Sequence, residues 1–338
     1  MVKIDKMEWD HCPEEEVQFF LQEMHKMSEH LVTEPKLPEM DRKLIINIAP
    51  NGATISHLEN PDIPCEPEKI IEDVIECYEA GASVWHTHIR VDKIRSHSFD
   101  NYLKCFDTVA KYCPDLIYSF TALADFKYMD HRLFQPLLDD LVAARGKQYC
   151  EMILLSPVTY SCGDFFYQPC TETAAIDQVQ YCQQLGLKPE IQVRNLDHLA
   201  RFKRFLIDSG VMTGKYVMNL CAGTHDSAPT GPNPWGFMNV LMMYQSFMDI
   251  PREKLCLGMV AGERNWLPIT TLGIMLGVDS VRIGAEEPVY MYPHKDEKIV
   301  RNVDCVNKIK SIANDLGREI ATPAEAREIM GMEPPTWC

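Results

Sequence analysis

The sequence has no long hydrophobic run and no excess of positive charge. No stretch approaches the roughly 18 consecutive apolar residues of a membrane span, so we expect no transmembrane helix. The 33 basic residues are outnumbered by 49 acidic residues, which gives a formal net charge of −16. This acidic balance argues against a nucleic-acid-binding surface or a surface for anionic membranes.

Paired cysteines are also missing. The 13 cysteines are odd in number, scattered from Cys12 to Cys338, and form no C-x-x-C pair. This usage is typical of a reduced protein in which cysteine serves as a small buried hydrophobe. The start of the chain lacks the apolar segment and small-residue cleavage site of a secretory signal. We therefore expect a cytoplasmic protein.

Glycine-rich nucleotide motifs are absent too, since the chain contains neither G-x-G-x-x-G nor a Walker A loop. From residue 43, a short β-rich run, a polar loop and a helical pattern recur eight times. The apolar runs extend from LIINIA (44–49) to SVRIG (280–284), and the last helical pattern of the repeat covers 296–316. Eight strand–helix units predict an α/β fold, a (β/α)8 TIM barrel.

Both ends of the chain add helices to this barrel. Val17, Phe20, Met24, Met27 and Leu31 recur at three- and four-residue steps, which predicts a helix with one apolar stripe. This helix either packs on its own barrel or contacts another subunit. In the tail, Thr322, Pro323 and Glu325 form a helix start with a capping box. We expect a helical extension over 1–40 and a barrel with its C-terminal helix over 41–338.

The most informative motif is W-H-T-H-I at the end of the second predicted strand. His86 and His88 are two residues apart, so both side chains point to the same face of a strand. If that face is the barrel interior, both imidazoles reach one ion, and Zn²⁺ is the usual partner. The alternative is a pair of hydrogen-bonded polar residues near the barrel mouth.

The end of the eighth predicted strand, SVRIGAEEPVY, offers a third ligand. Arg282 and Glu286 share one face, and Glu287 begins the loop. Neighbouring carboxylates can divide the roles of metal ligand and general base, and an arginine can anchor a substrate carboxylate. The alternative is a structural salt bridge.

Taken in order, the segments NIAPNGA, EAGASVWHTHIR, KPEIQV, VAGERN, VRIGAEEPVY and ATPAEAREI resemble the β-keto acid cleavage enzymes over about residues 43–332. The resemblance implies a zinc-dependent barrel that condenses a β-keto acid with acetyl-CoA to give acetoacetate and a new acyl-CoA. It implies that His86, His88 and Glu286 hold zinc and that Arg282 is an active-site arginine. It places Glu287 where the family has an aspartate implicated in removing the α-proton. We also expect a homo-oligomer, a dimer or tetramer.

Several positions matched by the resemblance are expected to contact the substrate. Thr121 keeps a catalytic hydroxyl of the third strand. The expected substrate-binding residues are Asn51, Thr54, Ser156, Gln192, Arg264 and Asn265.

Some of these positions depart from the family pattern. Thr54 stands where a glutamate often occurs, and Gln192 replaces another glutamate. Leu154 replaces a hydroxyl residue, for which Ser156 or Thr159 could serve. The loop after the sixth strand adds His225 and Asp226.

These departures leave three functions to separate. The first is the zinc-dependent acyltransferase, and the second is a zinc-dependent lyase or hydrolase that acts without CoA. The third is a non-catalytic assembly protein that uses the N-terminal helix as a contact. Retention of Arg282 beside two carboxylates argues against the third function, and dependence on acetyl-CoA separates the first two.

Overall fold

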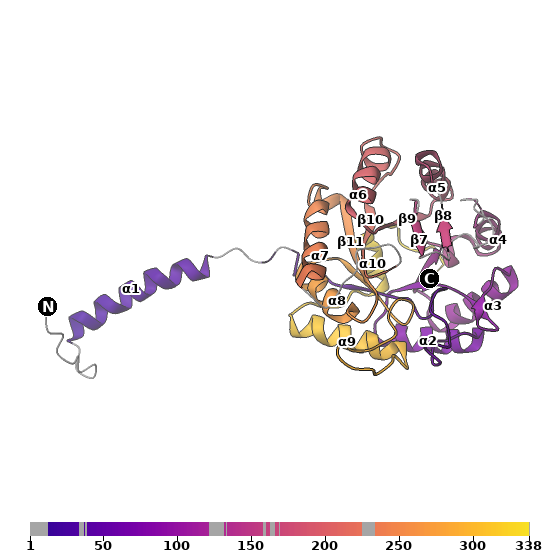
Figure 1. The fold of residues 1–338 in the computed structure, drawn as a ribbon. Helices are drawn as coiled ribbons and strands as arrows, with labels where there is room; N and C mark the ends of the chain where they lie inside the picture. The colour runs from indigo at the N-terminus through magenta and orange to yellow at the C-terminus, as the bar shows by residue number, and fades with distance from the viewer. Residues whose placement is uncertain are drawn as a thin grey trace. The chain divides into compact units, whose positions relative to one another are not determined.

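A computed structural model describes the chain in two compact units, Met1–Pro38 and Glu39–Cys338 (Figure 1). The described residues are 13–33, 37, 39–121, 132, 134–157, 160–162, 166–168, 170–224 and 234–337. Within them, no helix is long and apolar enough to cross a membrane. The predicted boundary at residue 40 stays a prediction.

The first unit contains one helix, α1 (Glu14–Val32). Three glutamates occupy its first turn, where their negative charges interact favourably with the positive end of the helix dipole. None of its side chains is buried, including those of the apolar stripe identified in the sequence.

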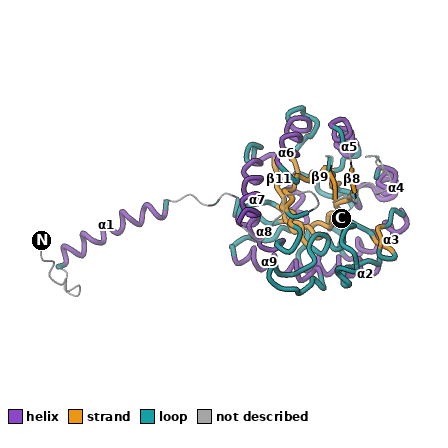
Figure 2. Tube along the Cα trace, viewed as in Figure 1, coloured by secondary structure: helices purple, strands orange, loops and turns teal. Residues whose placement is uncertain are grey.

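The second unit is built around a closed barrel of eight parallel strands, which confirms the predicted fold (Figure 2). The strands neighbour one another in the order β1-β12-β11-β10-β9-β6-β5-β2, and β2 closes on β1. In chain order they are β1 (Ile45–Ile48), β2 (Val84–Thr87), β5 (Ile117–Thr121), β6 (Met152–Leu155), β9 (Lys188–Val193), β10 (Tyr216–Ala222), β11 (Leu255–Ala261) and β12 (Ser280–Ile283).

Helices surround the barrel because each strand is followed by an amphipathic or apolar segment that covers its outer face (Figure 1). They are α2 (Pro67–Ala80), α3 (Phe99–Tyr112), α4 (Gln135–Arg145), α5 (Glu172–Gln184), α6 (Leu196–Phe202) with a π-helical turn (Lys203–Ile207), α7 (Pro234–Phe247), α8 (Trp266–Met275) and α9 (Asn302–Asp315). Short 3₁₀ turns are Gly146–Tyr149 and Arg252–Lys254, and two small hairpins pair β3 (Arg90–Val91) with β4 (Ile94–Arg95) and β7 (Tyr160–Cys162) with β8 (Phe166–Gln168).

The N-terminal ends of the strands are closed by an apolar plug. Inward side chains there, among them Ile45, Val84 and Met152, pack with Ala326 and Met330 of α10 (Pro323–Met330). The capping box between Thr322 and Glu325 is formed as predicted. This end of the barrel is therefore structural, and polar groups gather at the opposite end, where barrel enzymes place their sites.

The prediction of a helix from residue 296 is wrong at its start, because α9 begins only at Asn302. The preceding residues fold back as an irregular hairpin instead. The N–H of Met291 donates to the carbonyl of Glu297, and the N–H of Ile299 donates to the carbonyl of Val289. These backbone bonds outweigh the helical propensity of the KDEK segment.

Candidate active site

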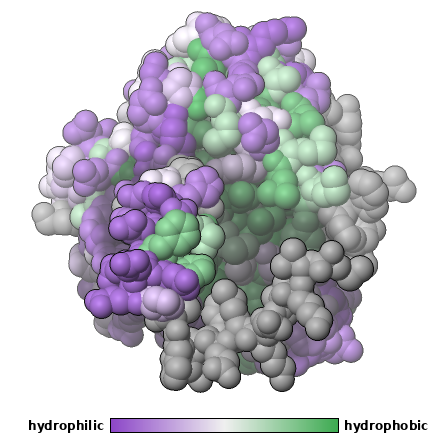
Figure 3. Space-filling model, turned by 90° about the vertical axis from the view of Figure 1, so that its left-hand side faces the viewer, coloured by the Kyte–Doolittle hydropathy of each residue, from purple (hydrophilic) through white to green (hydrophobic). Residues whose placement is uncertain are grey.

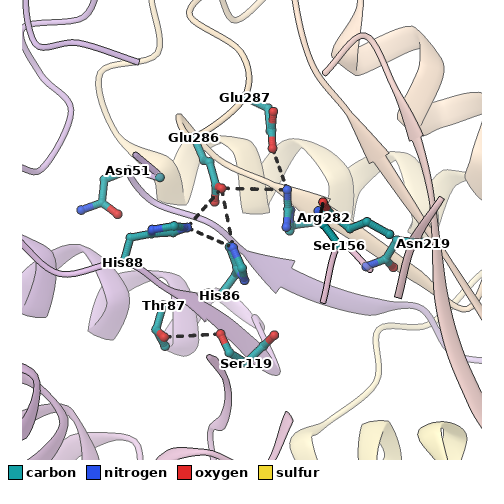
Figure 4. A network of polar contacts seen from close by, with 12 residues as sticks. Asn51, His86, Thr87, His88, Ser119, Ser156, Asn219, Arg282, Glu286 and Glu287 are labelled. Carbon is teal, nitrogen blue, oxygen red and sulfur yellow. Dashed lines mark hydrogen bonds and ion pairs between the residues drawn. The ribbon is translucent and has the colours of Figure 1, made fainter. Parts of the chain in front are cut away.

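The two histidines of the second strand point into the barrel mouth, as their spacing predicts. His86 lies in β2 and His88 directly follows it, and both side chains are almost completely buried. Their Nε2 atoms are 3.2 Å apart (Figure 4). Two imidazole nitrogens this close in a buried site can both bind a single metal ion.

Glu286 brings a carboxylate to the same point from the loop after β12. Its Oε1 lies 3.6 Å from Nε2 of His86 and 3.4 Å from Nε2 of His88 (Figure 4). The approach depends on Gly52, because a Cβ at that position would overlap the side chain of Glu286. It also depends on Gly284, whose φ of +120° is left-handed and whose absent Cβ makes room for the carbonyl of Ala49.

The three groups fit a metal ion in both geometry and chemistry. Two ligands of a tetrahedral zinc with bonds of about 2.0–2.1 Å lie roughly 3.3 Å apart, and all three measured separations are near this value. Both Nδ1 atoms and the Oε2 of Glu286 are buried with no hydrogen-bond partner in the described part of the chain. Among the described residues, this is the cluster of histidine, cysteine and carboxylate side chains that could hold an ion.

Burial and charge prepare these groups for a cation. Complete burial lowers the pKa of His88 to about 3, so its imidazole is neutral with a free lone pair. Burial alone would raise the pKa of Glu286, but the neighbouring imidazoles and the guanidinium of Arg282 hold it well below its ordinary value. A neutral imidazole and an ionised carboxylate are the forms that bind metals.

Arg282 links the cluster to Glu287. Its Nη2 is 2.6 Å from Oε1 of Glu287 and 3.9 Å from Oε1 of Glu286 (Figure 4). Burial opposes its charge, but the two carboxylates raise the pKa of Arg282. Nε and Nη1 have no hydrogen-bond partner within the described residues. These two N–H groups suit the binding of an anionic ligand in the mouth.

Further predicted residues line the same mouth. Thr121 ends β5 with a fully buried hydroxyl that has no hydrogen-bond partner in the described ranges. The hydroxyl of Ser156 donates to Oε1 of Gln192 over 3.1 Å. Asn51 is buried near Glu286, but its amide donates to the carbonyl of Pro64.

Two predicted substrate contacts, Thr54 and Arg264, are engaged elsewhere or exposed. Thr54 is exposed on the loop after β1. Arg264 donates to the carbonyl of Lys295 and to Asp296, and its guanidinium stacks on the ring of Tyr290. Asn265 is half-buried and directly precedes α8, at the end of the loop after β11, and its place relative to the cluster stays a prediction. Thr159, His225 and Asp226 lie outside the described residues.

Sequence reasoning missed a buried polar network deeper in the barrel. Glu190 of β9 accepts hydrogen bonds of 2.6 Å from both Ser119 and Asn219. Strand parity could have found it, because Glu190 shares a face with Gln192, and Ser119 shares one with Thr121.

Arg194 was missed as well. It is almost completely buried after β9, and its Nη2 donates to Gln192 and to Ser156 over 2.5 and 3.2 Å. The site therefore contains a second buried arginine beside two of the predicted substrate-binding residues.

Comparisons with known proteins show what this chain is similar to. Residues 43–332 match the family model of the β-keto acid cleavage enzymes. The chain is 28% identical over 307 residues to the 3-keto-5-aminohexanoate cleavage enzyme of Acetoanaerobium sticklandii, covering 86% of this chain and 98% of that protein. It is 22% identical to the 3-dehydrocarnitine:acetyl-CoA trimethylamine transferase of Rhizobium meliloti, over 85% of this chain and 96% of the relative.

A solved structure is similar in fold. The ternary complex of ObcA with a C4-CoA adduct and oxalate superposes with a TM-score of 0.65 at 18% identity, covering 80% of this chain and 68% of that chain. The family model spans nearly the whole barrel unit, from before β1 to the end of α10. The chain belongs to the β-keto acid cleavage enzyme family.

Proposed function

We propose that the protein is a cytoplasmic, zinc-dependent acyltransferase that condenses a β-keto acid with acetyl-CoA and releases acetoacetate and a new acyl-CoA. The observation that carries the proposal is the buried triad of His86, His88 and Glu286 at the barrel mouth, with Glu287 held beside it by Arg282. Relatives named as acetyl-CoA-dependent transferases support the reaction class.

His86, His88 and Glu286 would hold the zinc. Zinc bound there would supply Lewis-acid polarisation of the substrate's keto oxygen and a fixed orientation for the substrate. A Zn²⁺ ion bound by two uncharged imidazoles and one carboxylate would have one net positive charge, which favours an anionic substrate. A catalytic zinc keeps a fourth position for water or substrate.

The chain's own groups account for substrate orientation and proton transfer. The N–H groups of Arg282 that have no described partner bind the substrate carboxylate, and the hydroxyl of Thr121 donates to a substrate oxygen. The ion pair with Arg282 aims Glu287 at the carbon between the keto group and the carboxylate. Glu287 takes a proton from that carbon as general base.

The remaining steps use only the β-keto acid and acetyl-CoA, with no other reagent. The enolate carbon attacks the acetyl carbonyl of acetyl-CoA, and the CoA thiolate leaves. The thiolate then attacks the original keto carbon, and the bond between that carbon and the former α-carbon breaks. The new acyl-CoA and the acetoacetate enolate result, and Glu287 returns its proton to acetoacetate.

A panel of β-keto acids tests the proposal directly. Each acid is incubated with the zinc-loaded protein with and without acetyl-CoA, and the release of acetoacetate is measured. We expect release only when both substrates are present. Turnover of a β-keto acid without acetyl-CoA would establish the lyase or hydrolase alternative instead.

A further inference from the structure

Two neighbouring helices on the outside of the barrel contain no charged residue. α7 has the sequence PWGFMNVLMMYQSF, and α8 has the sequence WLPITTLGIM. The other barrel helices α2–α6 and α9 all contain charged residues, and α5 and α6, with Glu172, Asp177, Asp197 and Arg201, carry the fewest. A helix that is apolar all round is normally buried on every side.

Most of the exposed positions of these two helices are apolar, and the other exposed residues of α7, Asn239 and Gln245, are uncharged. The large apolar side chains exposed on them and at the end of α7 are Met238, Leu241, Met242, Met248 and Met275, with exposed fractions of 37–56%. Figure 3 shows apolar side chains gathered over this face of the barrel. The hydroxyl of Tyr244 donates to the carbonyl of Leu276, which ties α7 to α8. We call the five exposed side chains the α7–α8 face.

Charge determines which partner this face fits. The chain carries a net charge of −16, so two copies that met through an average surface would bring acidic groups together. In a twofold contact, the same patch occurs on both sides, and any charge near the axis meets its own kind. A face with no charged residue on its two helices avoids this cost.

We propose that the α7–α8 face is the contact between two copies of this chain. The two copies meet through the same face, so that the methionines and Leu241 of one copy pack against those of the other. Methionine is suited to such a seam because its flexible thioether adapts to an irregular partner surface. The expected homo-oligomer is thereby assigned a specific interface.

A pair of charge substitutions tests the interface in the full-length chain. Met238→Glu/Met242→Glu places two carboxylates one helical turn apart on the outer side of α7. Gln180→Glu/Gln184→Glu is the matched control, because these residues are exposed on α5 with the same spacing. Sedimentation velocity measures the assembly state, while circular dichroism and zinc content report folding.

We expect the wild type and the α5 control to be dimers or larger, and the α7 variant to be half their size. Like charges facing each other across the contact should raise its dissociation constant about 100-fold or more. A monomeric wild type, or an α7 variant that keeps its size, would overturn the proposal.

A third variant tests whether the N-terminal helix is the contact instead. Phe20→Glu/Met24→Glu disrupts the apolar stripe of α1 and changes no residue of the barrel unit. If this variant dissociates and the α7 variant does not, association runs through α1 and the proposal is wrong. If the α7 variant misfolds, hydrogen exchange of the wild type is measured at protein concentrations above and below the dissociation constant. The amides of α7 and α8 should exchange faster below it, where the two copies have separated. Exchange that does not change on dissociation would overturn the proposal.

Discussion

The side-chain carbonyl of Asn302 accepts a hydrogen bond of 2.7 Å from the backbone N–H of Ala285, the residue before Glu286. The amide of the same side chain donates to the carbonyl of Pro50, on the loop after β1, over 3.1 Å. Asn302 therefore joins the loop that carries the proposed metal ligand Glu286 to the neighbouring loop. Groups that fix the backbone of a ligand set the geometry of the metal site, although they never touch the ion.

Replacing Asn302 by alanine should weaken zinc binding by roughly 10-fold, the lower end of the effect of losing a group that orients a ligand. Both loops lose their shared partner, so Glu286 is no longer held toward the histidines. Titration with a competing chelator measures the affinity. Asn314→Ala on the exposed side of α9 is the control, and equal affinity in the two variants would contradict this role for Asn302.

Asp73 of α2 accepts a hydrogen bond of 2.8 Å from the amide of Asn302, and burial raises the pKa of Asp73 to about 7. Glu76 also raises this pKa, while Asn302 and Arg301 lower it. The folded-state pKa lies above the ordinary value of 3.8. The stability that accompanies a protonated Asp73 is therefore fully present below about pH 4 and is lost as the pH rises through about 7.

The free energy of unfolding should therefore fall, relative to the Asp73→Asn variant, between about pH 4 and pH 7. One pKa unit corresponds to about 1.4 kcal/mol, so after allowance for partial solvent access we expect a relative change on the order of 2 kcal/mol. Urea unfolding at several pH values measures it. Asp304→Asn, exposed on α9, is the control. A pH-independent difference would show that the pKa of Asp73 is not raised in the folded protein.

The zinc assignment predicts the loss of one ion per chain when both histidines are removed. His86→Ala/His88→Ala leaves only Glu286 of the three groups, and one carboxylate does not hold zinc at micromolar concentrations. Elemental analysis after gel filtration measures the content. The control is His25→Ala/His30→Ala on the exposed α1. Full occupancy in the β2 double variant would sink the assignment.

The sequence predicted the histidine pair because strand parity is a local property. Two residues of one strand that differ by two positions share a face whatever surrounds them, so His86 and His88 needed no tertiary information. The repeated strand–helix pattern was equally local, and the eight strands close into the predicted barrel. The role of Asn302 was not accessible, since its partners Pro50 and Ala285 lie far away in sequence.

The polar network around Glu190 was missed for a different reason. Functional residues of a barrel are expected at the strand ends, whereas Glu190 and Asn219 lie within their strands, below the mouth. A carboxylate in the interior is costly unless hydrogen bonds compensate it. Those hydrogen bonds come from two other strands, so only the closed barrel reveals them.

The charges of the mouth predict that an amino-bearing β-keto acid is a poor substrate. The family's glutamates are replaced by Thr54, which is exposed, and by Gln192, which accepts a hydrogen bond from the buried Arg194. A substrate ammonium group would therefore approach a guanidinium and would find no carboxylate at either position. Steady-state assays should give a kcat/KM for 3-keto-5-aminohexanoate at least about 10-fold below that for an uncharged analogue of equal length. Comparable values would show that the amine is recognised elsewhere.

Glu287 is the proposed base, and the assignment can be tested by changing either the length or the charge of its side chain. Its carboxylate is fixed by Arg282 at 2.6 Å, directly after the proposed metal ligand Glu286. The family aspartate implied by the resemblance is one methylene shorter, which corresponds to about 1.3 Å of reach. Leu154, which replaces a hydroxyl residue, faces the same interior, and we expect the cavity to match the longer acid.

Glu287→Gln keeps the length of the side chain but cannot accept the proton, so kcat should fall by roughly 10²- to 10⁴-fold while zinc content stays at the wild-type level. Glu287→Asp keeps the charge but retracts the carboxylate from the substrate, and a misplacement of about 1 Å can cost 10²-fold in rate. Both variants should therefore be slower than the wild type, and Leu154→Ser should not restore Glu287→Gln, because a hydroxyl cannot replace the base. Near-normal turnover of Glu287→Gln with acetyl-CoA would mean that Glu287 only orients Arg282. The base would then have to be sought in the loop after β10, where His225 and Asp226 are the next residues to substitute.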